Sequence, residues 1–251
     1  MPKAFDKNCE IISNDMINRN YFRLKVKTYS ALNHCIPGQF FMIGIPDVFL
    51  RRPIGIYNVE NDVLTFLYKL VGYGTKKLST IKTGQLSLLG PLGNGYDLKK
   101  IENLKYVAVV GGVGIAPINF LANKLKNKGI LYYGVRSKHD ILDLNIFKKK
   151  NWEIIISTED GSEGYKGYIT DLLQYNFDSK HILISSGPNL MLNKILKIAV
   201  EKHISGFISF DVKMACGLGN CQGCAIRVKD EIKMVCKDGP VFKIDDISFN
   251  L

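Results

Sequence analysis

The feature that most constrains this chain is a cluster of cysteines near its C-terminus. Cys216, Cys221, Cys224 and Cys236 have the spacing C-x4-C-x2-C-x11-C, and they are four of the six cysteines in the chain. Three thiolates at this spacing, with a fourth further along, are typical ligands of a [2Fe–2S] cluster. The sequence therefore predicts an iron–sulfur site at the end of the chain.

Glycines separate the cysteines of this stretch. Gly217, Gly219 and Gly223 lie between Cys216 and Cys224. Since three ligands must come from one short turn, we expect these glycines to supply positive φ angles and close backbone approach. Their amides would then point at the sulfurs and stabilise negative charge there.

Two other uses of the cysteines remain open. A structural zinc site favours paired C-x2-C motifs, and this chain has one C-x2-C and a first gap of four residues. Disulfides would suit a secreted protein. Met1 to Glu10 is charged and has no apolar signal region, and no stretch approaches the roughly 18 apolar residues of a spanning helix. We therefore favour the cluster, in a soluble cytoplasmic protein.

The charge is strongly basic, with a formal net charge of +11. Only six of the 34 basic residues are arginine, and the longest basic run is Lys148–Lys150. Because the lysines are scattered and no aromatic-basic module accompanies them, the charge favours a solvated surface over a nucleic-acid interface. Part of it could serve docking to an acidic partner.

The first hundred residues have the pattern of a small β domain. Short apolar runs are separated by Gly, Pro, Asn and Asp, which predicts an antiparallel barrel or sandwich with a short helical turn near 75–81. The expected strands are Tyr21–Lys27, Gln39–Ile45, Ile54–Val59, Val63–Leu70 and Gln85–Leu89.

From about residue 101 the pattern alternates between strands and helices, which predicts a doubly wound parallel sheet. Expected strands are Tyr106–Val110, Ile130–Val135, Glu153–Ser157, His181–Ser185 and Phe207–Val212. Expected helices are Pro117–Lys128, Asp140–Lys149, Thr170–Tyr175 and Pro188–His203. At 251 residues the chain has room for two modest domains. We expect a β-barrel domain over 1–100, an α/β domain over 101–205 and a small iron–sulfur module over 206–251.

A pyrophosphate clamp is predicted in the β domain. The run Arg52-Pro53-Ile54-Gly55-Ile56 precedes Gly74-Thr75 and Gly90-Pro91-Leu92-Gly93. An arginine offers a bidentate fork for a pyrophosphate. Backbone N–H groups at a helix start, with a threonine hydroxyl, form an anion site. A surface arginine is the plainer reading of Arg52 alone, and the three motifs together favour a flavin dinucleotide.

The α/β region contains a second nucleotide signal. Gly111-Gly112-Val113-Gly114-Ile115-Ala116-Pro117 follows a strand and begins a helix, although it is not G-x-G-x-x-G. An ordinary strand–helix turn is the alternative. Ligands of open α/β sheets bind at the carboxyl ends of strands. We therefore expect nicotinamide contacts there, at Gly134 with Arg136 and at Ser186-Gly187-Pro188.

Other chemistries are disfavoured. The chain has no H-E-x-x-H, G-x-S-x-G or Walker A motif. We expect His34, His139, His181 and His203 to be structural or solvated, Cys9 and Cys35 to be ordinary thiols, Glu159-Asp160-Gly161 to be a solvated turn, and Asp171 to lie in the first turn of a helix.

Taken together, these motifs resemble the ferredoxin–NADP reductase superfamily with an added C-terminal cluster. The chain is most similar to the electron-transfer subunits of type 1B dihydroorotate dehydrogenases. The resemblance covers nearly the whole chain and is carried by G-P-L-G-N-G-Y (90–96), T-E-D-G-S-E-G-Y-K-G-Y-I-T-D (158–171), M-A-C-G-L-G-N-C-Q-G-C (214–224) and V-C-K-D-G-P-V-F (235–242).

This resemblance implies FAD on the barrel, NAD(H) on the α/β domain and a [2Fe–2S] cluster on the cysteines. The implied partner is an FMN-containing catalytic subunit that oxidises dihydroorotate, in a heterotetramer with two copies of each chain. It implies no catalytic acid or base on this chain. The FAD contacts implied by position are Arg52, Pro53, Ile54, Gly55, Leu67, Tyr68, Lys69, Gly74 and Thr75.

The chain departs from the family pattern at two positions. Gly55 stands where the family often has serine, which puts a side-chain hydrogen bond near the reactive flavin nitrogen in doubt. Ser186 stands where the superfamily often has cysteine before Gly-Pro, which could change nicotinamide contacts.

Two alternative functions remain. One is the homologous FAD and [2Fe–2S] subunit of NADH-dependent ferredoxin–NADP or sulfide oxidoreductases. That group typically has aspartate at the first ligand position, and this chain has Cys216. The other is a non-enzymatic iron–sulfur redox sensor, which would need no flavin clamp.

Overall fold

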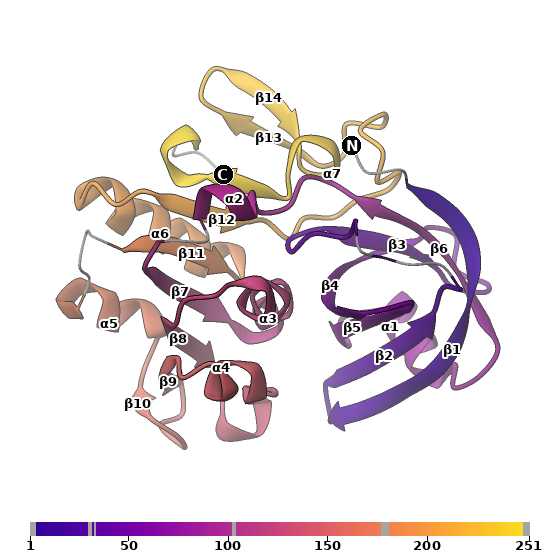
Figure 1. The fold of residues 1–251 in the computed structure, drawn as a ribbon, viewed down its shortest axis with the longest axis horizontal. Coiled ribbons are helices and arrows are strands. Elements are labelled where there is room, and N and C mark those ends of the chain that lie inside the picture. Colours follow the sequence, from indigo (N-terminus) through magenta and orange to yellow (C-terminus); the bar gives the residue numbers. More distant parts are fainter. Residues whose placement is uncertain (1–3, 30–31, 33, 102–103, 177–180, 248–251) are drawn as a thin grey trace.

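The structure of the protein is a computed structural model that describes residues 4–247, apart from 30–31, 33, 102–103 and 177–180. An N-terminal barrel lies beside a layered α/β sheet, and a C-terminal hairpin lies over the junction between them (Figure 1). The predicted combination of an antiparallel barrel with a doubly wound sheet is therefore confirmed.

The barrel is a closed six-stranded antiparallel sheet in the order β1-β2-β5-β4-β3-β6. Alternating apolar side chains fill its interior, and Leu24, Phe41 and Phe66 are fully buried there. The helix α1 (Tyr73–Thr80) follows β5. The strands are β1 (Phe5–Asn18), β2 (Tyr21–Lys27), β3 (Phe40–Gly44), β4 (Arg52–Glu60), β5 (Val63–Lys69) and β6 (Gln85–Leu92).

The long strand β1 was not among the predicted strands. Its sequence is mostly polar, and only Cys9, Ile11 and Asn14 on it are buried. It closes the barrel by pairing with β2 along one part of its length and with β6 along the other. A strand with so few buried side chains lacks the alternation from which strands are predicted.

The second layer system is a seven-stranded sheet in the order β10-β9-β8-β7-β11-β12-β15. Every neighbouring pair is parallel except β12 with β15. The strands are β7 (Tyr106–Gly111), β8 (Gly129–Val135), β9 (Glu153–Thr158), β10 (Tyr165–Lys166), β11 (Ile182–Ser186), β12 (Gly206–Ser209) and β15 (Val241–Lys243).

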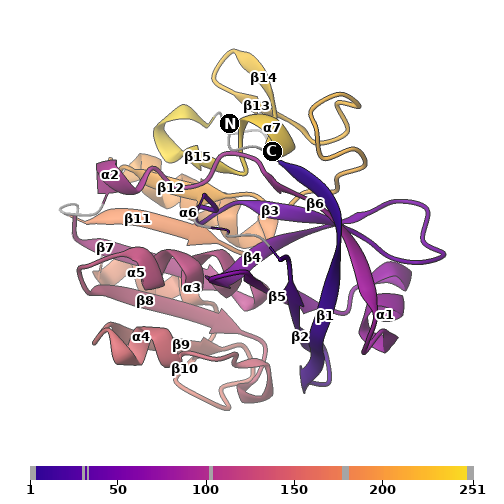
Figure 2. The ribbon, with the colours of Figure 1, turned by 45° about the vertical axis from the view of Figure 1, so that its right-hand side comes forward.

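Helices cover both faces of this sheet (Figure 2). Ala108 and Val110 of β7 pack in the same core cluster as α3, whereas Val107 and Val109 pack in the cluster with α5 and α6. The helical segments are α2 (Leu98–Ile101), η1 (Gly112–Gly114), α3 (Ile115–Lys124), η2 (Lys138–Asp140), α4 (Asn145–Lys149), α5 (Ile169–Asn176), α6 (Asn189–Glu201) and η3 (Ile244–Asp246).

Two helix predictions differ from the structure. The helix expected over 117–128 begins earlier and ends at Lys124, and the one expected over 140–149 is two short segments, η2 and α4. In the first case the glycine turn itself is helical, because Gly112–Gly114 forms a 3₁₀ turn that continues directly into α3. The expectation that Asp171 lies in the first turn of a helix is confirmed.

The C-terminal segment leaves the sheet and then returns to it. It contains the hairpin β13 (Ala225–Val228) and β14 (Glu231–Met234), followed by the short helix α7 (Val235–Asp238). The strand β15 then pairs with β12 at the edge of the sheet. The strands β12 and β15, which lie in the predicted iron–sulfur module, belong to the large sheet. The predicted boundaries of the three domains stay predictions. Among the described residues, no helix is both long and apolar enough to cross a membrane.

Candidate functional site: a cavity between barrel and sheet, beside a cysteine loop

A cavity of about 560 Å³ lies where the barrel, the sheet and the C-terminal segment meet. It brings together two sets of predicted residues that are far apart in the sequence. One set comes from the barrel, and the other comes from the glycine turn after β7. The predicted residues that line it are Arg52, Pro53, Ile54, Gly55, Leu67, Tyr68, Lys69, Thr75, Gly111, Gly112 and Gly114.

Gly74 does not line the cavity, although it was predicted with the others. It is buried behind Arg52, and a Cβ atom built on it would lie 2.4 Å from Nε of Arg52. The absence of a side chain at Gly74 therefore provides the space that the guanidinium occupies. The guanidinium also donates to the carbonyl oxygen of Leu50, within its own loop.

The N-terminus of α1 lies beside Arg52. Thr75 and Val71 line the cavity, and the Thr75 hydroxyl accepts hydrogen bonds from the N–H groups of Val71 (2.9 Å) and Gly72 (3.3 Å). The hydroxyl thus organises the turn before the helix. The helix start and the guanidinium both favour an anion in this part of the cavity.

The opposite wall is built by two turns at the carboxyl ends of neighbouring parallel strands. A Cβ atom on Gly114 would lie 2.3 Å from the carbonyl oxygen of Ser186, and one on Gly111 would lie 2.7 Å from Cδ of Pro188. The turn after β7 and the turn after β11 are therefore in direct contact. Gly112 adopts a φ of +52°, and its carbonyl accepts a hydrogen bond from the Tyr133 hydroxyl at 3.2 Å.

Several lining residues were missed by the sequence prediction. Tyr21 of β2 lines the cavity, with the Lys69 amine 5.6 Å from its ring centroid. Burial, with a contribution from Asp140, raises the pKa of Tyr21 to about 12, so its hydroxyl stays neutral. Val113, Ala116 and Pro117 of the predicted glycine motif also line the cavity. The other missed residues are Gly38, Phe40, Val71, Asn189, Leu190, Ser209, Phe210, Asp211, Met214 and Pro240.

The four cysteines of the C-terminal segment form two pairs. The sulfurs of Cys224 and Cys236 lie 3.2 Å apart, and the side chain of Cys221 lies close enough to Cys216 to help lower the pKa of its thiol. Within the described part of the chain, no three ligand-type side chains gather as around one metal ion. A tetrahedral zinc ion needs all its ligands around one point, whereas each iron of a [2Fe–2S] cluster takes two. The pairing therefore fits the cluster better than zinc.

Backbone amides of this loop point at the sulfurs. The N–H of Gly219 donates to Sγ of Cys236 at 3.1 Å, and the N–H of Leu218 donates to Sγ of Cys216 at 3.4 Å. Burial opposes ionisation of Cys216, but hydrogen bonds from the N–H groups of the loop hold its pKa below the usual value. Such N–H donors favour the thiolate over the thiol, and the thiolate is the form that binds iron.

The glycines of the loop behave as predicted at two positions and differently at the third. Gly217 and Gly219 have φ angles of +72° and +83°. Gly223 lies outside the positive-φ region, so the prediction was wrong there, and Gln222 has the positive φ (+57°) instead. The turn needs its left-handed residue one position earlier than expected.

The cavity and the cysteine loop share one strand. Phe40 of β3 lines the cavity, and Met42 on the same strand contacts the loop, since a Cβ atom on Gly217 would lie 2.6 Å from Cγ of Met42. Both side chains belong to one core cluster that also contains Cys224 and Cys236. The Cys224–Cys236 pair is therefore packed in the same core as the wall of the cavity, whereas Cys216 is half-buried and Cys221 is exposed.

Other residues singled out in the sequence lie elsewhere. Gly134 lies near the end of β8 and Arg136 follows it, and neither lines this cavity, whereas Ser186, Gly187 and Pro188 do. Cys9 and Cys35 are buried, and burial raises their thiol pKa values to about 11 and 12. In the described ranges, none of the histidines gathers with two other potential ligands. The turn 159–161 is exposed.

Comparison with known proteins gives a consistent result. Residues 211–248 match the iron-sulfur cluster binding domain of dihydroorotate dehydrogenase B. Two relatives carry the name dihydroorotate dehydrogenase B (NAD(+)), electron transfer subunit. The relative from Clostridium acetobutylicum is 36% identical over 245 residues, covering 96% of each chain. The relative from Bacillus pumilus is 32% identical over 263 residues, covering the whole of each chain.

Solved structures share the fold. A structure of an NADH-dependent reduced ferredoxin-NADP oxidoreductase, described in connection with flavin-based electron bifurcation, has a TM-score of 0.84 and 29% identity, over 96% of this chain and 90% of that one. The ferredoxin reductase of carbazole 1,9a-dioxygenase has a TM-score of 0.70 and 18% identity, over 80% of this chain and 67% of that one. The second likeness concerns the fold alone.

Proposed function

We propose that this chain, which belongs to the family of dihydroorotate dehydrogenase B (NAD(+)) electron transfer subunits, passes electrons from an FMN-containing catalytic subunit to NAD⁺ through a [2Fe–2S] cluster and FAD. Its role is a step of de novo pyrimidine (UMP) synthesis. The observation that carries the proposal is the four-cysteine loop, whose Cys224–Cys236 pair shares a core with the wall of a cavity that gathers the predicted flavin residues.

FAD is the cofactor that the barrel side of the cavity fits. Arg52, backed by Gly74, and the N-terminus of α1 would hold the pyrophosphate. The backbone of Ile54 and Gly55 and the side chains of Leu67 and Tyr68 would line the flavin. The buried Tyr68 hydroxyl donates to Oδ1 of Asn14 at 3.0 Å, which fixes the ring against the barrel.

NAD(H) fits the sheet side. The turn Gly111–Gly114 and the turn Ser186–Pro188 lie at the carboxyl ends of β7 and β11, where open α/β sheets bind nucleotides. The first turn has glycines, Gly111 and Gly114, at the positions where it touches the second. A nicotinamide bound against these two turns would face the barrel wall across the cavity.

The cluster would be held by Cys216, Cys221, Cys224 and Cys236. When bound, the flavin exchanges a hydride with nicotinamide and single electrons with the cluster. The chain itself orients both groups, supplies N–H donors to the sulfurs and keeps water from the shared core. No side chain is needed as a catalytic acid or base.

The division of labour follows the predicted domains. Residues 1–100 would hold FAD, 101–205 would bind NAD(H) and 206–251 would hold the cluster. The partner would be the catalytic subunit that oxidises dihydroorotate, in a heterotetramer with two copies of each chain. The family name supports a catalytic partner, and the stoichiometry belongs to the proposal.

A tagged chain purified anaerobically from its native cell tests this function. The expected result is one catalytic flavoprotein subunit in equal amount, and a complex that forms NADH from NAD⁺ when dihydroorotate is added. The chain freed of its partner should oxidise NADH with an artificial acceptor and leave dihydroorotate unchanged.

Co-elution of a different flavin or iron–sulfur subunit would favour the ferredoxin–NADP or sulfide oxidoreductase alternative, to which the similarity at a TM-score of 0.84 gives weight. A chain that binds iron and sulfide but no flavin would favour a redox sensor. The cavity that gathers the predicted FAD residues argues against the redox sensor, because a sensor needs no flavin site.

A further inference from the structure

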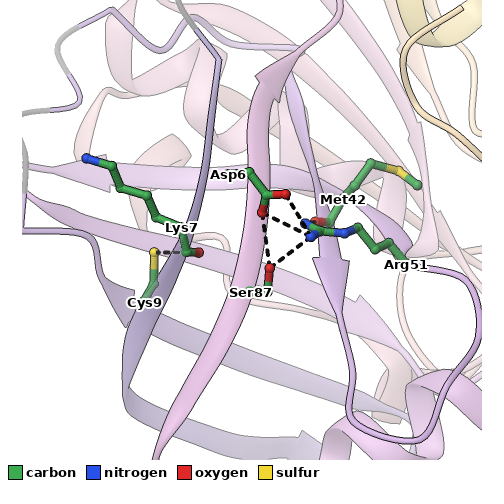
Figure 3. Close-up of polar contacts among 6 residues, drawn as sticks. All are labelled: Asp6, Lys7, Cys9, Met42, Arg51 and Ser87. Atoms are coloured by element: carbon green, nitrogen blue, oxygen red, sulfur yellow. Dashed lines mark hydrogen bonds and ion pairs between the residues drawn. The ribbon is translucent and has the colours of Figure 1, made fainter.

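Two consecutive arginines at the start of β4 point to opposite sides. Arg52 lines the cavity, whereas Arg51 lies among residues of β1, β3 and β6 (Figure 3). Neighbouring residues of an extended segment project in opposite directions. The position of one side chain therefore fixes the backbone that carries the other.

The Arg51 guanidinium makes a network of polar contacts that we call the Arg51 anchor: Arg51, Asp6 and Ser87. Nη2 of Arg51 donates to both carboxylate oxygens of Asp6 at 3.0 Å and to the Ser87 hydroxyl at 2.9 Å. The Ser87 hydroxyl donates to Oδ1 of Asp6 at 3.1 Å. Nη1 of Arg51 reaches the carbonyl oxygen of Met42 at 3.4 Å (Figure 3).

The same backbone determines where Arg52 lies. Nη1 of Arg52 donates to the carbonyl oxygen of Leu50, and it lies 3.5 Å from that of Arg51. Both acceptors belong to the segment that the anchor ties to the barrel. A shift of this segment would move the guanidinium away from its place against Gly74.

The loop before Arg51 has only one other ion pair among the described residues, between Asp47 and Lys77 of α1, at 3.5 Å. Phe49 in the same loop is 99% exposed, so apolar packing does not hold the loop at that point. The backbone of Arg52 pairs with Ile43 of β3, whereas residues 50 and 51 lie before the strand. The anchor is consequently the contact best placed to fix these two residues, whose carbonyl oxygens lie against the Arg52 guanidinium.

Barrel closure does not need the anchor. β1 and β6 pair through their backbones from Phe5 to Glu10, on either side of Asp6. The side chains of Arg51 and Asp6 are 29% and 55% exposed, and exposed ion pairs add little to stability. A contact that contributes little to the fold, yet fixes an arginine facing a ligand cavity, has its main effect on the ligand.

We propose that the Arg51 anchor is a positioning device that holds the Arg52 guanidinium where the FAD pyrophosphate binds. Arg51, Asp6 and Ser87 do not touch the cofactor and act through Arg52. The inference rests on the proposed FAD site.

The test compares the affinity of full-length variants for FAD. The Kd is obtained by diluting each holoprotein and following the rise of free-flavin fluorescence. Asp6→Asn removes the charge but keeps the shape, and Ser87→Ala removes one acceptor. Asp97→Asn is the matched control, since Asp97 forms a comparable exposed ion pair with Lys100 at 3.1 Å, away from the cavity lining.

Asp6→Asn should raise the Kd for FAD about tenfold, since a charge-assisted contact that orients the clamp is lost. Ser87→Ala should raise it about threefold, and Asp97→Asn should leave it unchanged. The thermal midpoint of the FAD-stripped chain should be the same for all three variants and wild type.

The decisive comparison measures the effect of Asp6→Asn in a chain that also carries Arg52→Ala. In that background Asp6→Asn should change the Kd less than about twofold, because the guanidinium that the anchor positions is gone. An equal effect of Asp6→Asn in both backgrounds would overturn the inference, as would an unchanged Kd or a lowered thermal midpoint of the stripped Asp6→Asn chain. A wild-type chain that binds no FAD would overturn the FAD site and this inference together.

Discussion

The cysteine loop and the cavity beside it are assembled in different ways. The first three cysteines lie within residues 216–224, and the fourth follows a single hairpin. The cavity draws its lining from Tyr21 to Pro240, that is, from the barrel, the sheet and the C-terminal segment. One site is encoded by local spacing, and the other exists only after the chain has folded.

This difference determines how each site should fail. A local site depends on a few ligands and on the backbone angles of one loop, so single substitutions within the loop should abolish it while the rest of the molecule is unaffected. An assembled site depends on the space between helices and strands that pack together. Substitutions that add a side chain where two elements touch should weaken ligand binding, and the same substitutions elsewhere should not.

The largest effect is expected for a cluster ligand. Cys221→Ser should remove most of the iron and the cluster absorbance from the purified chain, because a thiolate ligand is lost, while bound FAD stays near one per chain. Iron, sulfide and flavin contents measured on the same sample check this.

Cys35→Ala is the control for Cys221→Ser, since Cys35 is a thiol of the barrel core outside the loop. It should keep the cluster. An intact cluster in the Cys221→Ser chain would break the ligand assignment, and a parallel loss of FAD would show that the two sites are not independent.

A smaller effect on one cofactor is expected from Gly74→Ala. The added Cβ would lie 2.4 Å from Nε of Arg52, so the guanidinium must move and the Kd for FAD should rise about tenfold or more. Since Gly74 lies within α1, alanine should also stabilise the FAD-free chain by up to about 1 kcal/mol.

Gly72→Ala is the matched variant for Gly74→Ala. Nothing lies within 4 Å of its Cβ position, and its φ of −156° is extended backbone that alanine adopts. It should bind FAD as wild type does in fluorescence titration. Equal affinities for the two variants would show that Arg52 does not need the space at Gly74.

The smallest effect tests the contact between the two regions. Gly217→Ala places a Cβ 2.6 Å from Cγ of Met42 at a φ of +72°, and we expect a loss of about 1–3 kcal/mol of stability with partial cluster content. Gly223→Ala meets only Sγ of Cys221, at 3.6 Å, and should change stability by less than about 0.5 kcal/mol.

Chemical denaturation of the two chains, together with their iron content, distinguishes these outcomes. If Gly217→Ala were as stable as Gly223→Ala and retained full cluster content, the loop would not depend on its contact with β3. The cavity and the loop would then be neighbours without mechanical coupling.

The sequence predicts the elements whose side chains alternate strongly. β2 and β5 were placed within a residue of their observed bounds, because both alternate or are continuously apolar. β1 was missed because its pairing partners on β2 and β6, not its own apolar content, make it a strand. The hairpin β13–β14 was missed because each of its strands has only four residues, too few for a clear alternation.

The site follows the same division. The clamp around Arg52 and the glycine turn were predicted because each is a short sequence motif with a chemical rationale of its own. Tyr21 and Phe210 belong to no such motif, and only the packing of separate segments brings them to the cavity. The positive φ at Gln222, which was expected at Gly223, could not be predicted from a motif either, because it depends on how the folded loop closes.

The antiparallel pairing of β15 with β12 has a consequence for assembly. Residues 210–240 leave the sheet beside Ser209 and return to it at Val241, which pairs with Ser209, and the N–H of Phe210 bonds the carbonyl of Pro240 at 3.0 Å. The cysteines thus lie on a long loop whose two ends are hydrogen-bonded to each other at the sheet edge. Bringing the two ends of a loop together costs conformational entropy. The pairing of β15 with β12 already meets this cost, so the cysteines are held near one another. We therefore expect the sheet to fold before a metal cluster is inserted into the cysteine loop.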